Sequence, residues 1–306
     1  MSQRFLAIGE CMVEMAPQDS GDYALSYAGD TFNTAWYMRK MASADIEVAY
    51  LTGAGNDALS KRFTDFIQDA GIIPEIGVVP DRTIGLYMIS LENGERSFQY
   101  WRSASAARCL AQHLEPLAAL TEGDTAYFSG ITMAILANED REILLNALTA
   151  AKTAGVKVVF DTNLRPRLWK DLDEMKQWVM RAAAVADMTL PSFDDEAEFF
   201  GDADKRATMA RYHEAGVKQV IVKDGPNPVL FLDETGAEVE YKPTLNPAPV
   251  DTTAAGDSFN AGFLAAYLQG KDLNTAVAAG CDLSYQVVSQ RGALVELAYD
   301  KVCLAD

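Results

Sequence analysis

The sequence predicts an α/β fold in which helices cover a mainly parallel sheet and a small β-sheet lid is attached. From about residue 121 onward, short apolar runs alternate with segments of helical periodicity, as in a parallel sheet with crossover helices. The N-terminal part instead contains an Asn-Gly pair between two strand-like segments, which is the strongest short signal for a β-hairpin. We therefore expect one domain over 1–306, with the lid contributed by approximately 10–33 and 82–106.

The individual elements follow from the spacing of apolar residues. Each predicted strand is a short apolar run that ends near glycine or a polar turn, and each predicted helix has apolar residues three and four positions apart. The predicted elements are strands at 5–8, 47–51, 84–91, 96–102, 126–128, 156–160 and 219–222, a short strand near 188, and helices at 57–70, 138–154, 173–185, 195–200 and 204–215.

Composition and charge restrict the class of protein. Of the 306 residues, 49% are hydrophobic, which is enough apolar material for a large core. The net charge of −18 argues against nucleic acid or an anionic membrane surface as a partner, because these need a basic face. No apolar stretch is long enough to cross a membrane, and the N-terminus does not resemble a cleavable leader. We therefore expect a cytoplasmic protein.

The cysteines and histidines indicate neither a metal site nor a nucleophile. The four cysteines are far apart and form no C-x-x-C pair, so we expect them to be reduced and structural. The two histidines offer no zinc spacing and no convincing nucleophile–base pair. These residues are Cys11, Cys109, Cys281, Cys303, His113 and His213.

The most informative segment is Asp-Thr-Thr-Ala-Ala-Gly-Asp at 251–257, directly before a predicted helix with Phe259 and Phe263 on its apolar face. The first N–H groups of a helix lack intrahelical partners and lie at the positive end of the dipole, and small side chains let a phosphate approach them. Asp257 could then accept a proton from a hydroxyl while the amides stabilise charge. We expect the dipole to keep Asp257 ionised. A simple helix cap is the alternative.

This segment resembles the C-terminal signature of the ribokinase-like (phosphofructokinase-B type) family of carbohydrate kinases, and the resemblance covers nearly the whole chain. It implies a ribokinase-like three-layer αβα core, a β lid over the sugar, and homo-oligomers formed through the lid. It also implies ATP and Mg²⁺, and leaves open a K⁺ ion beside Asp251. By the same resemblance Asp257 is the catalytic base, and Ala254, Ala255 and Gly256 form the anion hole and contact the nucleotide.

A second segment resembles the family's glycine-rich sugar-binding segment. Residues 28–35 read Ala-Gly-Asp-Thr-Phe-Asn-Thr-Ala, with alanine where the family usually has its first glycine. The match assigns Gly29, Asp30 and Asn33 to sugar hydroxyls. The alternative is a polar turn that caps a helix at Thr34.

Two segments depart from the family pattern. The magnesium motif N-x-x-E falls at 193–196, where Phe193 replaces the asparagine and Glu196 keeps an indirect role toward Mg²⁺. The nucleotide turn Gly-x-x-Gly falls at 225–228, where Pro228 replaces the second glycine. The resemblance assigns the nucleotide to Asn163, Arg165, Lys223 and Gly225.

Within the family, the resemblance points to the kinases of 2-keto-3-deoxygluconate. It rests on residues 85–87, 94–102 and 161–169. It implies ATP-dependent phosphorylation of this sugar acid to its 6-phosphate. The residues that it assigns to the substrate on this basis are Tyr87, Tyr100, Arg102 and Arg165.

The hairpin gives an independent geometric argument. If Asn93 and Gly94 form a two-residue turn, Tyr87 pairs with Tyr100 and Gly85 stands opposite Arg102, all on one face. A guanidinium fits a carboxylate bidentately, and a desolvated arginine in an acidic chain needs an anionic partner. This favours a sugar acid as the substrate. Alternatively, the face is a buried aromatic surface and Arg102 pairs with a protein carboxylate.

Two other functions stay open. A kinase for a neutral sugar such as fructose or ribose would share the phosphate site. A sensor that binds a sugar acid without catalysis is the other alternative, because Phe193 and Pro228 alter two motifs.

Overall fold

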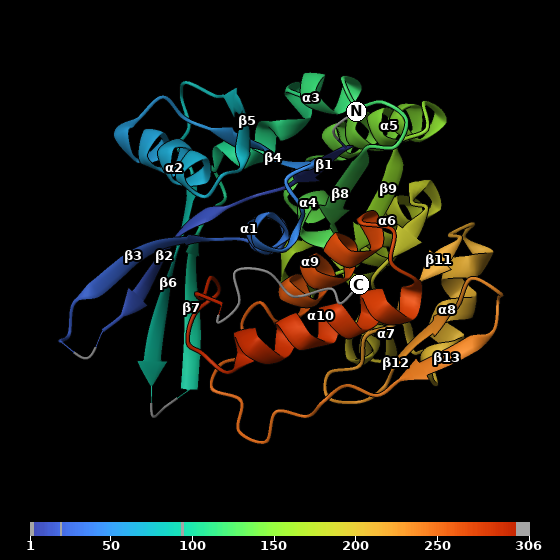
Figure 1. Cartoon of the computed structure of the whole chain (residues 1–306). Helices are drawn as coiled ribbons and strands as arrows, with labels where there is room; N and C mark the ends of the chain where they lie inside the picture. The colour runs from blue at the N-terminus through green and yellow to red at the C-terminus, as the bar shows by residue number, and fades with distance from the viewer. Residues whose placement is uncertain (1–2, 19, 93–94, 298–306) are drawn as a thin grey trace.

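The computed structural model describes residues 3–18, 20–92 and 95–297, and a seven-stranded sheet forms its centre (Figure 1). The strand order is β11-β10-β9-β8-β1-β4-β5, and every neighbouring pair is parallel. The strands are β1 (Gln3–Ile8), β4 (Ile46–Ala54), β5 (Ile73–Val78), β8 (Thr125–Ser129), β9 (Lys157–Asp161), β10 (Met188–Thr189) and β11 (Gln219–Val220). The predicted parallel sheet is confirmed.

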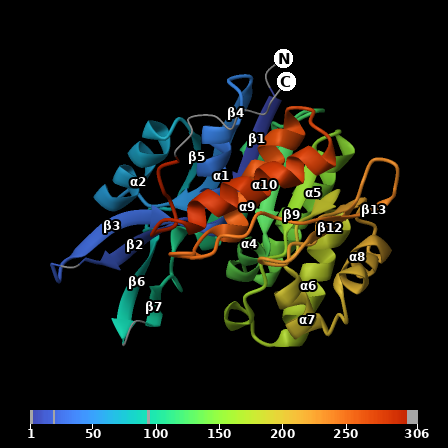
Figure 2. The same cartoon turned by 60° about the horizontal axis from the view of Figure 1, so that its bottom comes forward.

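Alternating side chains of the sheet divide the core into two clusters. In β1, Phe5 and Ala7 belong to a cluster with helices α1 (Asp30–Met41), α9 (Ala255–Leu268) and α10 (Leu273–Val288). Leu6 and Ile8 point the other way, into a cluster with α5 (Asn138–Thr153) and α6 (Leu172–Val185). Figure 2 shows α1, α9 and α10 side by side. Because side chains alternate between the two faces of a strand, a strand that is apolar throughout can pack against helices on both faces. The predicted three-layer core is confirmed.

A four-stranded sheet extends from one side of the core and forms the predicted lid (Figure 1). Its order is β3-β2-β6-β7, with β2 parallel to β6 and the other pairs antiparallel. The strands are β2 (Met12–Pro17), β3 (Tyr23–Ala28), β6 (Gly85–Glu92) and β7 (Glu95–Trp101). Tyr87 pairs with Tyr100 and Glu92 with Glu95, which confirms the predicted register. The turn residues 93–94 lie outside the described residues. The assignment of 1–306 to one domain stays a prediction.

The remaining elements cover the edges of the core. They are α2 (Ala58–Asp69), α3 (Glu115–Ala118), α4 (Gly130–Ile135), α7 (Phe193–Phe200), α8 (Lys205–Glu214), β12 (Val229–Leu232), β13 (Glu238–Tyr241) and 3₁₀ helices at 106–112 and 166–168. The five helices with predicted bounds are present, with ends shifted by at most two residues, and the helix expected after Asp257 already begins at Ala255. The helix expected near Thr34 begins at Asp30, with Gly29 at its N-cap. The elements that were not predicted are β2, β3, β5, β12, β13, α3, α4, α10 and the two 3₁₀ helices.

Two chain-wide predictions are tested only in part. Cys11, Cys109 and Cys281 are free, whereas Cys303 lies outside the described residues. Within the described part of the chain, no helix combines the length and apolar character needed to cross a membrane. The cytoplasmic localisation stays a prediction.

Candidate active site

A cleft of about 910 Å³ lies between the lid and the carboxyl ends of the core strands. The start of α9 forms its floor, and the hairpin of β6 and β7 forms one wall. The charged side chains that line it are Arg102, Arg165, Arg167, Lys223, Asp30, Asp161, Asp195 and Asp257. Four cationic and four anionic side chains therefore line one cleft of a chain whose net charge is −18, so the cleft is much less negative than the chain as a whole.

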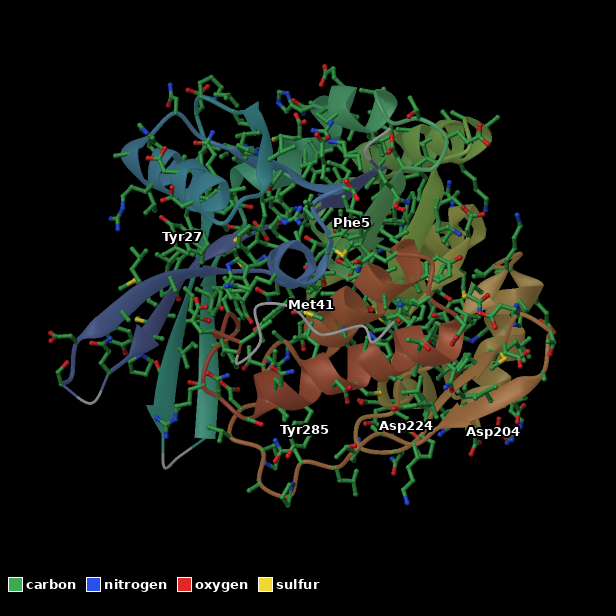
Figure 3. The ribbon with its side chains drawn as sticks, in the orientation of Figure 1. Phe5, Tyr27, Met41, Asp204, Asp224 and Tyr285 are labelled. Carbon is green, nitrogen blue, oxygen red and sulfur yellow. The ribbon has the colours of Figure 1, made fainter. Side chains whose placement is uncertain are left out.

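A second pocket of about 480 Å³ adjoins the cleft on the side of α10. The two share residues at the start of α9 together with Arg165 and Lys223. Tyr285 on α10 and Asp224 on the loop before β12 border this second pocket (Figure 3). Its lining also includes the apolar side chains Leu245, Phe259 and Val288. A flat, largely apolar group can thus lie in this pocket while an attached anion reaches the cleft.

The N-terminus of α9 has no side-chain cap among the described residues. Its N-cap, Ala254, has left-handed backbone angles with a φ of 60°. The N–H of Ala255 donates to the carbonyl of Thr252 at 3.2 Å, so it is already used. The N–H groups of Gly256 and Asp257 have no acceptor among the described residues. The anion hole assigned to 254–256 stays a prediction. Within the described residues the N–H groups of Ala254 and Gly256 have no acceptor, and the N–H of Asp257 adds a third free donor.

Asp257 lies at this floor, close to the start of α1. Asn33 Nδ2 donates to its Oδ2 at 2.7 Å. Burial, followed by the neighbouring Asp30 carboxylate, raises the pKa of Asp257 to about 7. Burial therefore acts against the expected effect of the helix dipole, which favours the ionised form. A carboxylate that titrates near neutrality is a better proton acceptor than an ordinary aspartate.

The segment before α1 brings three predicted residues, Gly29, Asp30 and Asn33, to the cleft. A side chain at Gly29 would stand 2.1 Å from the carbonyl oxygen of Glu10, so close packing of the backbone requires glycine here. Asp30 accepts a hydrogen bond from Asn163 Nδ2 at 2.7 Å, and burial raises the pKa of Asp30. The glycine is thus explained by packing, whereas the two polar side chains face the cleft.

The lid wall brings Tyr87, Tyr100 and Arg102 together, as the register predicts. The rings of Tyr87 and Tyr100 lie 5.8 Å apart, with Tyr87 buried and Tyr100 exposed. Arg102 Nη2 forms an ion pair with the buried Glu10, so the pairing with a protein carboxylate that the sequence left open does occur. Its Nε is buried without a hydrogen-bond partner among the described residues.

The opposite wall carries the residues assigned to the nucleotide. Lys223 Nζ donates to Asp161 Oδ1 at 3.2 Å and to Asn260 Oδ1 at 3.0 Å. The same Nζ would be 3.7 Å from a side chain at Gly256, so Lys223 stands beside the predicted anion hole. Arg165 lines both pockets with a half-exposed side chain, and Gly225 lines the second pocket.

The structure does not bring Glu196 or Asp251 to either pocket. The carboxylate of Glu196 accepts hydrogen bonds from Thr162, Arg211 and Tyr212 at 2.8–3.0 Å, and burial raises its pKa to about 7. Asp251 accepts hydrogen bonds from Thr253 and Gly292. The described residues contain no group of three or more His, Cys, Asp or Glu side chains that could hold a metal ion.

Sequence reasoning missed several charged residues around the cleft. Arg167 and Asp195 line it, and both are close in sequence to residues that were assigned. Glu10 and Glu14 are buried carboxylates at the base and on the inner face of the lid. Glu14 lies on β2, but Glu10 lies in the segment between β1 and β2, so strand alternation could have indicated the face of Glu14 only.

Comparisons with known proteins agree with this geometry. The family model described as pfkB family carbohydrate kinase matches residues 2–297. The 2-dehydro-3-deoxygluconokinase of Haemophilus influenzae is 39% identical, covering 97% of this chain and 96% of that protein. The protein of the same name from Escherichia coli K12 is 36% identical, covering 96% and 98%.

A solved structure supports the fold independently. The aminoimidazole riboside kinase of Salmonella enterica, complexed with aminoimidazole riboside and an ATP analog, matches with a TM-score of 0.82. The match covers 95% of this chain and 94% of that chain at 22% identity. The ribokinase-like fold predicted from the sequence is confirmed.

Proposed function

The chain belongs to the pfkB family of carbohydrate kinases, and we propose that it phosphorylates 2-keto-3-deoxygluconate (2-dehydro-3-deoxygluconate) with ATP, forming the 6-phosphate. The observation that carries the proposal is the half-buried Asp257 beside the free N–H groups of Gly256 and Asp257, on the floor of a cleft that Arg102, Arg165, Arg167 and Lys223 also line. The names of the two relatives above support this choice of sugar acid.

Asp257 is the proposed general base. It would accept the proton of the attacking hydroxyl, and its pKa of about 7 suits this task. The N–H groups of Gly256 and Asp257 and the ammonium of Lys223 would bind the transferring phosphoryl group, on which negative charge is spread in the transition state. Asn33, which donates to Asp257, would hold the carboxylate in place.

The nucleotide is proposed to span the two pockets. Its base and ribose would occupy the second pocket, against Phe259 and Tyr285, and its phosphates would reach the start of α9 past Lys223. The complex of the Salmonella kinase with an ATP analog supports a nucleotide site in this fold. The substrate would lie under the lid, against Asp30, Tyr100 and Arg102.

Magnesium is expected to arrive with the nucleotide. Glu196 does not fit a direct ligand, because three buried donors already occupy its carboxylate. Asp195 lines both pockets and fits better, since Mg²⁺ is usually held by one or two carboxylates together with substrate phosphates. When bound, the ion neutralises charge on phosphate oxygens.

A monovalent cation beside Asp251 stays part of the proposal. Asp251 ties Thr253, in the loop before α9, to Gly292, in the segment after α10. An ion held there would therefore adjust the anion hole. Titration with KCl against tetramethylammonium chloride at constant ionic strength tests it: activation by K⁺ alone supports the site, and equal rates contradict it.

We also propose that the chain forms homo-oligomers through the outer face of the lid. The register places apolar side chains on the face opposite the cleft, and several are exposed: Trp101 is 57% exposed, Tyr23 40% and Leu25 38%. Met15 and Met88, on the same face, are half-buried. An exposed apolar patch of this kind is typical of an interaction surface.

The competing functions are separated by substrate. A kinase for a neutral sugar is favoured by one observation, namely that Glu10 already pairs with Arg102. A non-catalytic sensor is opposed by the complete arrangement of Asp257, Gly256 and Lys223.

A substrate panel tests the proposal. ATP consumption is measured with 2-keto-3-deoxygluconate, its galactonate-derived epimer, fructose and ribose, and NMR locates the phosphate on the product. We expect kcat/KM for the acid to exceed that for fructose by about 100-fold or more. Equal or better turnover of fructose would contradict the sugar-acid assignment. Tight binding of the acid without phosphorylated product would favour the sensor.

A further inference from the structure

Glu14 is a buried carboxylate on the inner face of the lid. In the register of the sheet, Glu14 of β2 stands beside Ser26 of β3 and Tyr87 of β6, so all three side chains share the face that looks into the cleft. Glu14 and Tyr87 are each only 7% exposed. Tyr87 lines the cleft, whereas Glu14 lies behind it in a smaller pocket.

The hydrogen bonds of Glu14 fix the orientation of the Tyr87 hydroxyl. Ser26 Oγ donates to Glu14 Oε1 at 2.9 Å, and the Tyr87 hydroxyl donates to Glu14 Oε2. A carboxylate is an acceptor only, and a phenol has a single proton to donate. Burial and the neighbouring carboxylate raise the pKa of Tyr87, so the phenol keeps this proton. Its one donor is therefore directed at Glu14.

Tyr87 lines the cleft, so the remaining lone pairs of its oxygen would be the part of the hydroxyl available to a ligand. They can accept a hydrogen bond from a hydroxyl, but the oxygen has no second proton to donate to a carboxylate or keto oxygen. An anionic group in this corner would also stand near the buried Glu14 charge. Arg102 is the diagonal neighbour of Tyr87 across the hairpin. Its Nε is buried and has no hydrogen-bond partner among the described residues. The inner face of the lid thus has one corner suited to a donor and one suited to an acceptor.

We propose that Glu14 is a positioning residue that holds Tyr87 as a hydrogen-bond acceptor, so that this corner of the lid selects a substrate hydroxyl and excludes the carboxylate. The proposal rests on the proposed function, in which the lid covers the sugar acid. The carboxylate of the substrate is then directed toward Arg102. A site built around a buried polar group discriminates strongly against a ligand that cannot pair with it.

The test exchanges the polarity of the pair without changing its size. In Glu14→Gln, the amide can donate to the Tyr87 oxygen and release the phenolic proton toward the cleft. Tyr87→Phe removes the hydroxyl, and Ser26→Ala is the matched control, because it removes a bond to Glu14 but leaves Tyr87 in place. Each variant is assayed with the sugar acid and with analogues in which one hydroxyl at a time is replaced by fluorine, an atom that cannot donate.

We expect Glu14→Gln and Tyr87→Phe each to raise KM about tenfold with little change in kcat, since one hydrogen bond is lost. The double variant should be no worse than Tyr87→Phe, because both changes act through one contact. In the wild type, one fluorinated analogue should show the same increase in KM, and Tyr87→Phe should abolish that difference. Ser26→Ala should stay within about threefold of wild type.

Several outcomes would overturn the proposal. These are an unchanged KM in folded Glu14→Gln, additive effects in the double variant, or a wild-type enzyme that treats every fluorinated analogue alike. Should Glu14→Gln fail to fold, the analogue panel on wild type and Tyr87→Phe decides alone. Should the wild type phosphorylate a neutral sugar instead, the proposed function fails, while the same variants and analogues of that sugar still test the role of Glu14.

Discussion

The floor and the lid of the cleft are held in place by different kinds of contact. At the floor, Asn33 of α1 donates to the carboxylate of Asp257 and Thr34 of α1 donates to its backbone carbonyl, so two distant parts of the core fix one residue of α9. The lid is held mainly by its own strand pairing, and its hairpin exposes Tyr100 and Trp101. Rigid elements position reacting groups more accurately than mobile ones do. The floor therefore suits phosphoryl transfer, and the lid suits recognition of the sugar.

The strongest challenge to this comparison is removal of the base from the floor. Asp257→Asn keeps the shape of the side chain but cannot accept a proton, so kcat should fall about 1,000-fold while the substrate still binds. Steady-state kinetics and calorimetric binding measure the two effects. Asp173→Asn, which changes an exposed aspartate in the first turn of α6, is the matched control and should retain full activity. Near-normal turnover in Asp257→Asn would refute the base assignment.

The pH dependence examines the same residue without a substitution. Because the pKa of Asp257 is raised to about 7, the carboxyl holds a proton below that pH and cannot act as a base. We expect kcat/KM to fall about tenfold per pH unit below pH 7 and to level off above it. A profile that stays flat down to pH 5 would show that Asp257 titrates as an ordinary aspartate.

Substitution of Glu196 tests whether this residue has a structural role beneath the floor or a role toward magnesium. Glu196→Gln leaves the partly buried Arg211 with a weakened partner beside the buried Thr162 and Tyr212, so we expect a loss of about 2 kcal/mol in the free energy of unfolding. The Mg²⁺ dependence of ATP binding should not change. Glu198→Gln, on the exposed side of the same helix, is the control. A large shift in the Mg²⁺ dependence of ATP binding with unchanged stability would show that Glu196 acts toward Mg²⁺.

The lid should affect selectivity more than rate. In Arg102→Ala, KM for the sugar acid should rise about tenfold, while KM for fructose should change much less, because only the acid pairs with the guanidinium. The ratio of the two KM values is the readout, since loss of the Glu10 ion pair also lowers stability. Arg82→Ala, which removes an arginine bonded to the Ser105 carbonyl, should leave the ratio unchanged. Equal effects on both sugars would refute the carboxylate role.

The smallest effect on chemistry is expected at the outer face of the lid. Trp101→Lys places a charge on the exposed apolar surface and should shift the protein toward monomers in light scattering, with kcat within about twofold of wild type. Leu172→Lys alters an apolar residue that is 44% exposed on α6 and should leave assembly unchanged. An unaltered oligomeric state in Trp101→Lys would contradict assembly through the lid.

Features set by local sequence could be predicted. A helix after the small residues at 251–257 is indicated by its apolar face, although it already begins at Ala255. The hairpin register follows from the Asn-Gly turn and strand alternation. Both depend on residues that are neighbours in the chain, so spacing alone determines them.

Features set by tertiary contacts could not be predicted. Thr31 and Thr34 obscure the apolar pattern of α1, yet both are buried because their hydroxyls bond to Tyr50 and to the Asp257 carbonyl. The raised pKa of Asp257 depends on burial and on Asp30, which are brought to it only by folding. The pairing of Arg102 with Glu10 likewise joins residues far apart in the sequence.

The most direct measurement is a crystal structure of Asp257→Asn with a non-hydrolysable ATP analog and 2-keto-3-deoxygluconate. The terminal phosphate should lie within hydrogen-bond distance of the N–H groups at positions 256 and 257, with a sugar hydroxyl between it and the side chain at 257. A terminal phosphate bound far from the start of α9 would contradict the assignment of this helix as the site of phosphoryl transfer.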